Sequence, residues 1–190
     1  MRKIIVQEMV TVDGFFAGPK GEIDWHNVDA EFNEYALENL GHIDTLMFGR
    51  MTYDLMASYW PTEGALTDDP LVAERMNSLP KIVFSKTMDK LDWNNSTVLK
   101  TIDAEEIRKI KEAPGKDIAI FGSGVLVEQL TELGLIDEYR LIVNPVILGQ
   151  GRTIFAGLKE RKNVEFLSSR SFASGNIMLC YAPVGNHIDE

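Results

Sequence analysis

The sequence predicts an α/β fold: a mixed, mostly parallel sheet with helices on both faces and an antiparallel hairpin at its C-terminal edge. Short apolar runs of strand type alternate with segments of helical spacing through most of the chain. The last two strand-like runs instead follow one another across Ala173-Ser174-Gly175, which indicates a hairpin. The 190 residues are 45% hydrophobic and contain no linker-like segment, so we expect a single domain over residues 1–190.

Each expected element has its own signal. Asp29, Asp69 and Asp103 stand where helix N-caps are needed, each ahead of residues that keep helical spacing. Two further helices are expected at residues 51–59 and 125–133, and the polar stretch 61–69 is expected to be a surface loop beside the site. The expected strands are short apolar runs at residues 3–12, 45–48, 81–85, 97–99, 117–121, 138–147, 164–172 and 176–182.

Charge and cysteine content exclude several classes of protein. The net charge is -10, from 19 basic and 29 acidic side chains. Such a surface repels nucleic acid and anionic membrane, so we expect neither as a partner. The single cysteine, Cys180, allows no internal disulfide, and no apolar run approaches the roughly 18 residues of a membrane span. We therefore expect a protein of the reducing cytoplasm.

The histidines give no sign of a metal site. His26, His42 and His187 lack the spacing of metal ligands and have no cysteine partner nearby in the sequence. We expect all three at the surface and no bound metal.

Ligands of open α/β sheets bind at the carboxyl ends of strands, and the strand predicted at residues 117–121 ends in a glycine-rich loop. Gly122, Ser123, Gly124 and Val125 lead into a helix, where backbone N–H groups can approach a phosphate closely. The alternative is a plain turn between a strand and a helix.

Two other strand ends carry candidate anion ligands. Gly49, Arg50 and Thr52 open one predicted helix, and Ser85-Lys86-Thr87 ends the strand at residues 81–85. Arginine offers planar donors for a phosphate, and serine, threonine and lysine offer hydroxyl groups and an ammonium group. The alternatives are a surface arginine beside a capping threonine and an ordinary polar strand end.

Five segments in order resemble the dihydrofolate reductase superfamily. The match is closer to its branch named for the C-terminal reductase domain of the bifunctional riboflavin-biosynthesis deaminase–reductase (RibD C-terminal-like), and it extends over about residues 3–182. The segments are TVDGFFAG (11–18), MFGRMTY (47–53), KIVFSKT (81–87), IFGSGVLVEQL (120–130) and LIDEYRLIVNPVILGQGRTIF (135–155).

The resemblance implies a three-layer dihydrofolate reductase-like fold, a homodimer as in the riboflavin branch, and NADPH as the cofactor. It places the nicotinamide against residues 9–18, so that Met9, Phe16 and Trp25 lie beside the substrate. Its implied cofactor ligands are Gly122, Ser123, Gly124 and Val125 at the pyrophosphate, Gly49, Arg50 and Thr52 at phosphate oxygens, and Ser85, Lys86 and Thr87 at the adenosine 2′-phosphate.

Two acidic residues are candidates for the catalytic group. Glu8 alternates with apolar residues of its strand, so it is either a functional acid with a raised pKa or a strand residue at the solvent edge. Asp13 stands in the sequence Asp13-Gly14 and is either a catalyst or a turn former.

The function implied by the resemblance is reduction of a small heterocyclic substrate, in the first place 5-amino-6-(5-phosphoribosylamino)uracil of the riboflavin pathway. Two departures from the family pattern leave alternatives open. Ala30 stands where dihydrofolate reductases have an acidic residue, and Phe121 stands where the riboflavin-pathway reductases usually have glutamate. The alternatives are a dihydrofolate or pterin reductase, a nucleotide- or flavin-binding module without catalysis, and a structural protein.

Overall fold

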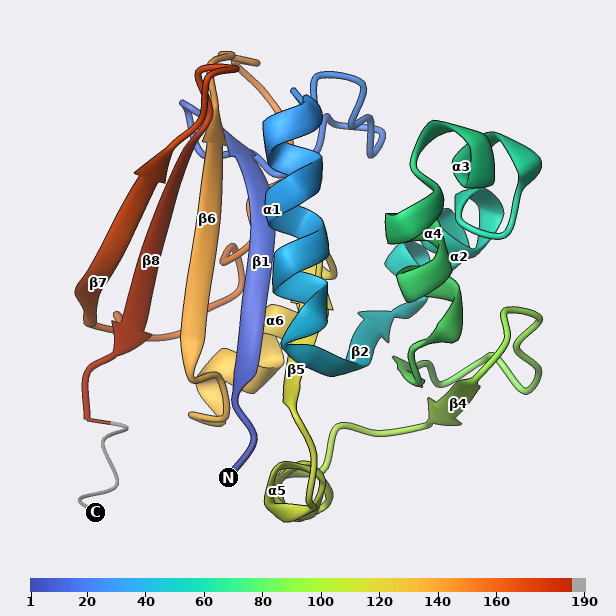
Figure 1. The fold of residues 1–190 in the computed structure, drawn as a ribbon. Coiled ribbons are helices and arrows are strands. Elements are labelled where there is room, and N and C mark those ends of the chain that lie inside the picture. Colours follow the sequence, from blue (N-terminus) through green and yellow to red (C-terminus); the bar gives the residue numbers. More distant parts are fainter. Residues whose placement is uncertain (186–190) are drawn as a thin grey trace.

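Eight strands form one mixed sheet in the computed structural model, which describes residues 1–185. The strand order is β4-β3-β2-β5-β1-β6-β8-β7, and β1 to β6 run parallel (Figure 1). β8 is antiparallel to both β6 and β7, which confirms the C-terminal hairpin. The bounds are β1 (Ile4–Thr11), β2 (Ile43–Gly49), β3 (Lys81–Phe84), β4 (Ser96–Leu99), β5 (Asp117–Phe121), β6 (Glu138–Asn144), β7 (Val164–Ser171) and β8 (Ile177–Pro183).

Three helices, α1, α4 and α5, begin at the predicted capping residues. The side chains of Asp29, Asp69 and Asp103 each accept a hydrogen bond from a backbone N–H in the first turn of α1, α4 and α5, respectively. The bounds are α1 (Ala30–Gly41), α2 (Arg50–Tyr59), α3 (Glu63–Asp68), α4 (Pro70–Ser78), α5 (Ala104–Glu112) and α6 (Gly124–Glu132).

Helices cover both faces of the sheet, as predicted, and each face has its own core. On one face, Ile4 and Val6 of β1 pack in a cluster with residues of α5 and α6. On the other face, Ile5 belongs to a cluster with residues of α1, α2 and α4. Figure 1 shows α1 on one side of β1 and α6 on the other. The two clusters sandwich β1, whose side chains are almost all buried.

The carboxyl end of β1 has a free edge. Pairing between β1 and β5 ends at Gln7 and Phe121, where β5 stops. Pairing between β1 and β6 continues four residues further, to Thr11 and Asn144. From Glu8 onward, β1 therefore lacks a neighbouring strand on the β5 side, and this gap positions the site.

The structure corrects two sequence predictions. The segment 61–69 is not a plain loop, because it contains α3, which Thr62 caps and whose Ala65 is fully buried. The strand predicted at residues 138–147 ends early, at Asn144, where the chain bends so that the Val146 N–H donates to the Asn144 carbonyl.

The Asp69 cap gives a testable prediction about stability. Asp69→Ala removes the acceptor of the Val72 N–H, so the free energy of unfolding should fall by about 1 kcal/mol in urea denaturation. The exposed neighbour Asp68 is the control, and Asp68→Ala should change stability by less than about 0.5 kcal/mol. Equal effects of the two substitutions would contradict the capping role.

Candidate active site

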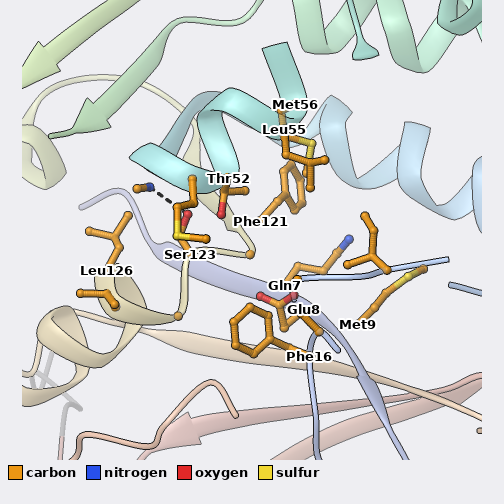
Figure 2. Close-up of a pocket in the computed structure, with 18 of the residues that line it drawn as sticks. Gln7, Glu8, Met9, Phe16, Thr52, Leu55, Met56, Phe121, Ser123 and Leu126 are labelled. Atoms are coloured by element: carbon orange, nitrogen blue, oxygen red, sulfur yellow. Dashed lines mark hydrogen bonds between the residues drawn. The ribbon is translucent and has the colours of Figure 1, made fainter. Parts of the chain in front are cut away.

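A large open cavity of about 910 Å³ lies at the carboxyl ends of the parallel strands. Its lining includes Gln7, Glu8 and Met9 of β1, which border the gap that β5 leaves open. Figure 2 shows these three residues below α2, with Phe16 beside Glu8. The volume is at the upper end of the range for small-molecule sites, so the cavity has room for more than one ligand group.

Two helices point uncapped N-termini into this cavity. Gly49 precedes α2 and Ser123 precedes α6, and no side-chain hydrogen bond caps either helix at these residues. Both residues line the cavity. The other helices in residues 1–185 are capped by side chains of Asp29, Thr62, Asp69 and Asp103. The uncapped N–H groups and the positive helix ends make this part of the cavity suitable for an anion.

The turn that starts α6 is conformationally demanding. Gly122 has φ +68° and is followed by Ser123 at φ 70°, a left-handed conformation that is uncommon for a residue with a side chain. A Cβ atom on Gly122 would lie 3.0 Å from Cγ2 of Thr52, so the position requires glycine. Ser123 Oγ accepts a hydrogen bond from the Gly49 N–H (2.8 Å), which joins the two helix starts (dashed line in Figure 2).

Cationic side chains surround the same part of the cavity. Arg50, Lys86 and Lys100 line it from the start of α2 and the ends of β3 and β4. Arg50 donates to Thr87 Oγ1 (2.9 Å), and Lys100 pairs with the exposed Asp89. These charges and the two helix starts together make this part of the cavity suitable for an anion, although the net charge of the protein is -10.

Glu8 is a buried acid at the free edge of β1. Its side chain lines the cavity, the residue is 5% exposed, and Oε2 has no hydrogen-bond partner. Burial raises the pKa of Glu8 to about 8, although the Gly122 N–H partly opposes that rise. At neutral pH Glu8 therefore carries a proton that it can donate.

The opposite half of the cavity is largely apolar. Met56 and Trp60 of the α2 end and Phe121 of β5 line it together with side chains of α1 and α4. Figure 2 places Met56 and Leu55 above Phe121. This half suits a flat, apolar ring system.

The structure brings most of the predicted site residues together. Those that line the cavity are Glu8, Met9, Phe16, Gly49, Arg50, Thr52, Ser85, Lys86, Gly122, Ser123, Gly124 and Val125. Asp13, Trp25 and Thr87 are not among its lining residues.

Each of these three has another contact. The Asp13 carboxylate accepts hydrogen bonds from Thr11 Oγ1 (2.6 Å) and the Gly149 N–H (2.7 Å), and the first of these is the main reason its pKa is lowered. Trp25 Nε1 donates to the Glu22 carbonyl (3.2 Å), and Thr87 accepts from Arg50.

Sequence reasoning missed several lining residues. His26, expected at the surface, is instead partly buried in the cavity wall, and burial lowers its pKa to about 4. His187 lies outside the described residues. Gln7 and Lys100 were also missed. Lys100 directly follows β4, just as Ser85 directly follows β3. Its position at the carboxyl end of a strand is the sequence signal by which Lys100 could have been found.

The geometry agrees with comparisons to known proteins. Residues 2–178 match the family described as the RibD C-terminal domain. Among curated proteins, the uncharacterized protein YyaP of Bacillus subtilis (strain 168) is 36% identical over 182 residues, which covers 95% of this chain and 94% of YyaP.

Two solved structures share the fold. One is a protein from Shewanella sp. PV-4 named for riboflavin biosynthesis, with a TM-score of 0.73 and 24% identity, covering 95% of this chain and 98% of that chain. The other is dihydrofolate reductase from Enterococcus faecalis complexed with NADP(H), with a TM-score of 0.65 and 16% identity, covering 96% of each chain. These similarities confirm the predicted dihydrofolate reductase-like fold. Within residues 1–185, no helix has both the length and the apolar character that crossing a membrane requires.

The buried acid predicts a pH-dependent stability. The pKa of Glu8 is higher in the folded chain than the ordinary value of 4.5, so this group lowers stability progressively as pH rises from about 4.5 to about 8. Glu8→Gln removes the titration. The variant should equal the wild type near pH 4 and exceed it at pH 7 by on the order of 3 kcal/mol. Urea denaturation across this range tests it, and parallel stability curves for the two proteins would refute it.

Proposed function

The chain belongs to the RibD C-terminal domain family, and on this premise we propose that it is an NADPH-dependent reductase of a small heterocyclic substrate. The observation that carries the proposal is the pair of uncapped helix starts, joined by Ser123 and surrounded by cations, beside a buried protonated acid. The family and its dihydrofolate reductase-like fold support a reductase, and the cavity supplies a place for both a dinucleotide and a substrate ring.

The residues present fit NADPH. The N–H groups at the starts of α2 and α6 would hold the pyrophosphate, and Gly122 leaves the space that its close approach needs. Ser85 and Lys86, with Thr87 behind them, would hold the adenosine 2′-phosphate. Lys86 has no ion-pair partner within residues 1–185, so its ammonium group is free to bind a phosphate.

Reduction of a C=N or C=O bond needs a hydride and a proton. NADPH, when bound, supplies the hydride. We assign the proton to Glu8, whose carboxyl group is neutral at pH 7 and lies in the cavity wall beside Phe16. The cavity would hold the two reactants side by side, which is the positioning that hydride transfer needs.

Two substrates should be tested first. The resemblance to riboflavin-pathway reductases points to 5-amino-6-(5-phosphoribosylamino)uracil, and the fold points to dihydrofolate or another reduced pterin. The main competing function is a module of the same fold that holds a nucleotide or a flavin without hydride transfer.

Nucleotide titration tests the cofactor assignment. We expect micromolar NADPH binding, followed by tryptophan fluorescence and calorimetry, and binding of NADH at least 10-fold weaker. The double variant Ser85→Ala with Lys86→Ala should weaken NADPH binding roughly 10- to 100-fold, because it removes charge-assisted hydrogen bonds. The same variant should leave NADH binding unchanged.

The exposed Lys90 lies outside the cavity lining and is the matched control, so Lys90→Ala should bind NADPH like the wild type. Binding of neither nucleotide would refute the proposed function. Binding of NADPH without oxidation by any heterocycle would support the non-catalytic module instead.

We further propose a homodimer that pairs through the C-terminal edge of the sheet. β7 is an edge strand, and Phe166 and Leu167 are 61% and 46% exposed on it. Ile177 of the neighbouring β8 is 46% exposed as well. Exposed apolar side chains on a sheet edge are typical of a surface that a second copy covers.

A charge on this edge should break the dimer. We expect the wild-type protein to elute with the mass of two chains in size-exclusion chromatography with light scattering, and Phe166→Glu to elute as one chain. Val12 is a control because it is similarly exposed (60%) but directly follows β1, which β6 and β8 separate from β7, so Val12→Glu should remain dimeric. A monomeric wild type would refute the dimer.

A further inference from the structure

Gln7 of β1 lines the cavity, and its amide oxygen is occupied by two donors of α1. Its carbonyl oxygen Oε1 accepts hydrogen bonds from Tyr35 Oη (2.8 Å) and Asn39 Nδ2 (3.1 Å), both on α1. Gln7 also lines the cavity, where Figure 2 shows it next to Glu8 and Met9 on β1. With its oxygen occupied on the α1 side, the amide nitrogen is left for the cavity.

A charged group sets the direction of this amide. Arg140 can only donate hydrogen bonds, and its Nη1 donates to Asn39 Oδ1. Glu138 holds Arg140 in place, with Oε1 2.6 Å from Nε. Because Asn39 Oδ1 accepts from Arg140, Asn39 Nδ2 must face Gln7. Gln7 must then accept this hydrogen bond with its amide oxygen. The chain of contacts therefore fixes which end of Gln7 a ligand meets.

The surroundings of Gln7 in the cavity carry no charge. Among residues 1–185, α1 and α4 contribute only apolar side chains and amides to the lining: Phe32, Asn33, Ala36, Asn39, Leu40, Val72 and Met76. The cations Arg50, Lys86 and Lys100 stand at the helix start and strand ends of the other half.

Two further lining cations, Lys20 and Arg152, belong to the loops that follow β1 and β6, and among the described residues the hydrogen bonds of Gln7 go to Tyr35 and Asn39 rather than to either cation. Arg152 donates to the Pro19 carbonyl, and the nearby Ile154 backbone lies against Gly124 at the start of α6. A phosphate beside Gln7 would therefore be buried without a countercharge, which is costly.

We infer that the apolar half of the cavity binds an uncharged, unphosphorylated ring compound, rather than the phosphorylated uracil named above, and that Gln7 selects it by donating a hydrogen bond to a carbonyl oxygen or another acceptor on the ring. The inference rests on the proposed function, because the cofactor would occupy the cationic half. Arg140 acts as a positioning residue, since it is not among the lining residues and acts on the ligand only through Asn39 and Gln7. Asn39 lines the cavity, and its amide is held between Arg140 and Gln7, so it fixes the direction of the Gln7 amide.

Matched ring compounds test this selection on protein saturated with NADP⁺, with fluorescence of the cavity residue Trp60 as the signal. The probes are pteridine-2,4-dione, which presents carbonyl oxygens, pteridine-2,4-diamine, which presents amino groups at the same positions, and uridine 5′-monophosphate, which adds a phosphate. We expect the dione to bind more tightly than the other two. Gln7→Met keeps a similar length but removes the donor, so it should weaken dione binding about 10-fold and leave NADP⁺ binding unchanged.

A second variant tests the direction of the amide. Asn39→Asp places a carboxylate between Arg140 and Gln7, so Gln7 should turn over and present its oxygen to the cavity. Dione binding should then fall about 10-fold and diamine binding should rise. General structural damage would weaken both. Adding Gln7→Met to Asn39→Asp should abolish the gain for the diamine, whereas a simple effect of the new charge would survive it.

Several results would overturn the inference. These are dione binding by Gln7→Met within twofold of the wild type, no change of preference in Asn39→Asp, tighter binding of uridine 5′-monophosphate than of the dione, or no binding of either pteridine by protein that binds NADP⁺. The NADP⁺ titration is performed first. Failure at that step refutes the proposed function and the inference together, whereas failure with the probes alone refutes only the inference.

Discussion

The left-handed turn at Gly122 and Ser123 is the constraint on which the rest of the site depends. It stops β5 at Phe121 and so frees the edge of β1. It also starts α6 without a side-chain cap, because the Ser123 hydroxyl accepts its hydrogen bond from Gly49 at the start of α2 instead. This single turn therefore leaves room for the cavity beside β1, directs the N-termini of α2 and α6 toward it, and joins these two N-termini by a hydrogen bond. The backbone cost of a left-handed serine, of order 1 kcal/mol, is consistent with a functional site.

The cationic half of the cavity shows how an acidic protein can hold an anion. The carboxylates that pair with Arg50 and Lys100 are exposed, so they compete only weakly with a bound anion. Arg50 lies 3.6 Å from Asp54 in an exposed pair, and Lys100 pairs with Asp89, whose side chain is 86% exposed. Exposed ion pairs contribute about 0–1 kcal/mol each, so a phosphate that also receives helix N–H groups can displace the carboxylates. Local donors, rather than net charge, decide what this surface binds.

Local sequence signals were sufficient for most of the fold and for most residues that line the cationic half of the cavity. Asp29, Asp69 and Asp103 act within one helical turn, so their capping role is visible without the tertiary structure. The residues at strand ends meet because parallel strands deliver their carboxyl ends to one edge. In contrast, α3 has only one buried residue, Ala65, and its formation depends on contacts with the rest of the chain.

The apolar half of the cavity depends on how α1 packs against the sheet, which the sequence does not show. Alternation along β1 separates Gln7 from Glu8, but only the docked helix brings Tyr35 and Asn39 to Gln7. His26 was assigned to the surface because nothing in its local sequence indicates its partial burial. Asp13 has a strong local signal as a turn former, and its bonds to Thr11 and the loop at Gly149 match that interpretation.

The uncapped starts of α2 and α6 also bear on how long the folded chain survives. Without a ligand, the first backbone N–H groups of these two helices have no side-chain cap and rely on water. A ligand that occupies them stabilises the folded state by RT ln(1 + [L]/Kd), which at a hundredfold excess over Kd is about 2.7 kcal/mol. Proteases act on opened chains, so degradation of this protein should slow when its ligand is plentiful. Its abundance would then follow the supply of the molecule that it uses.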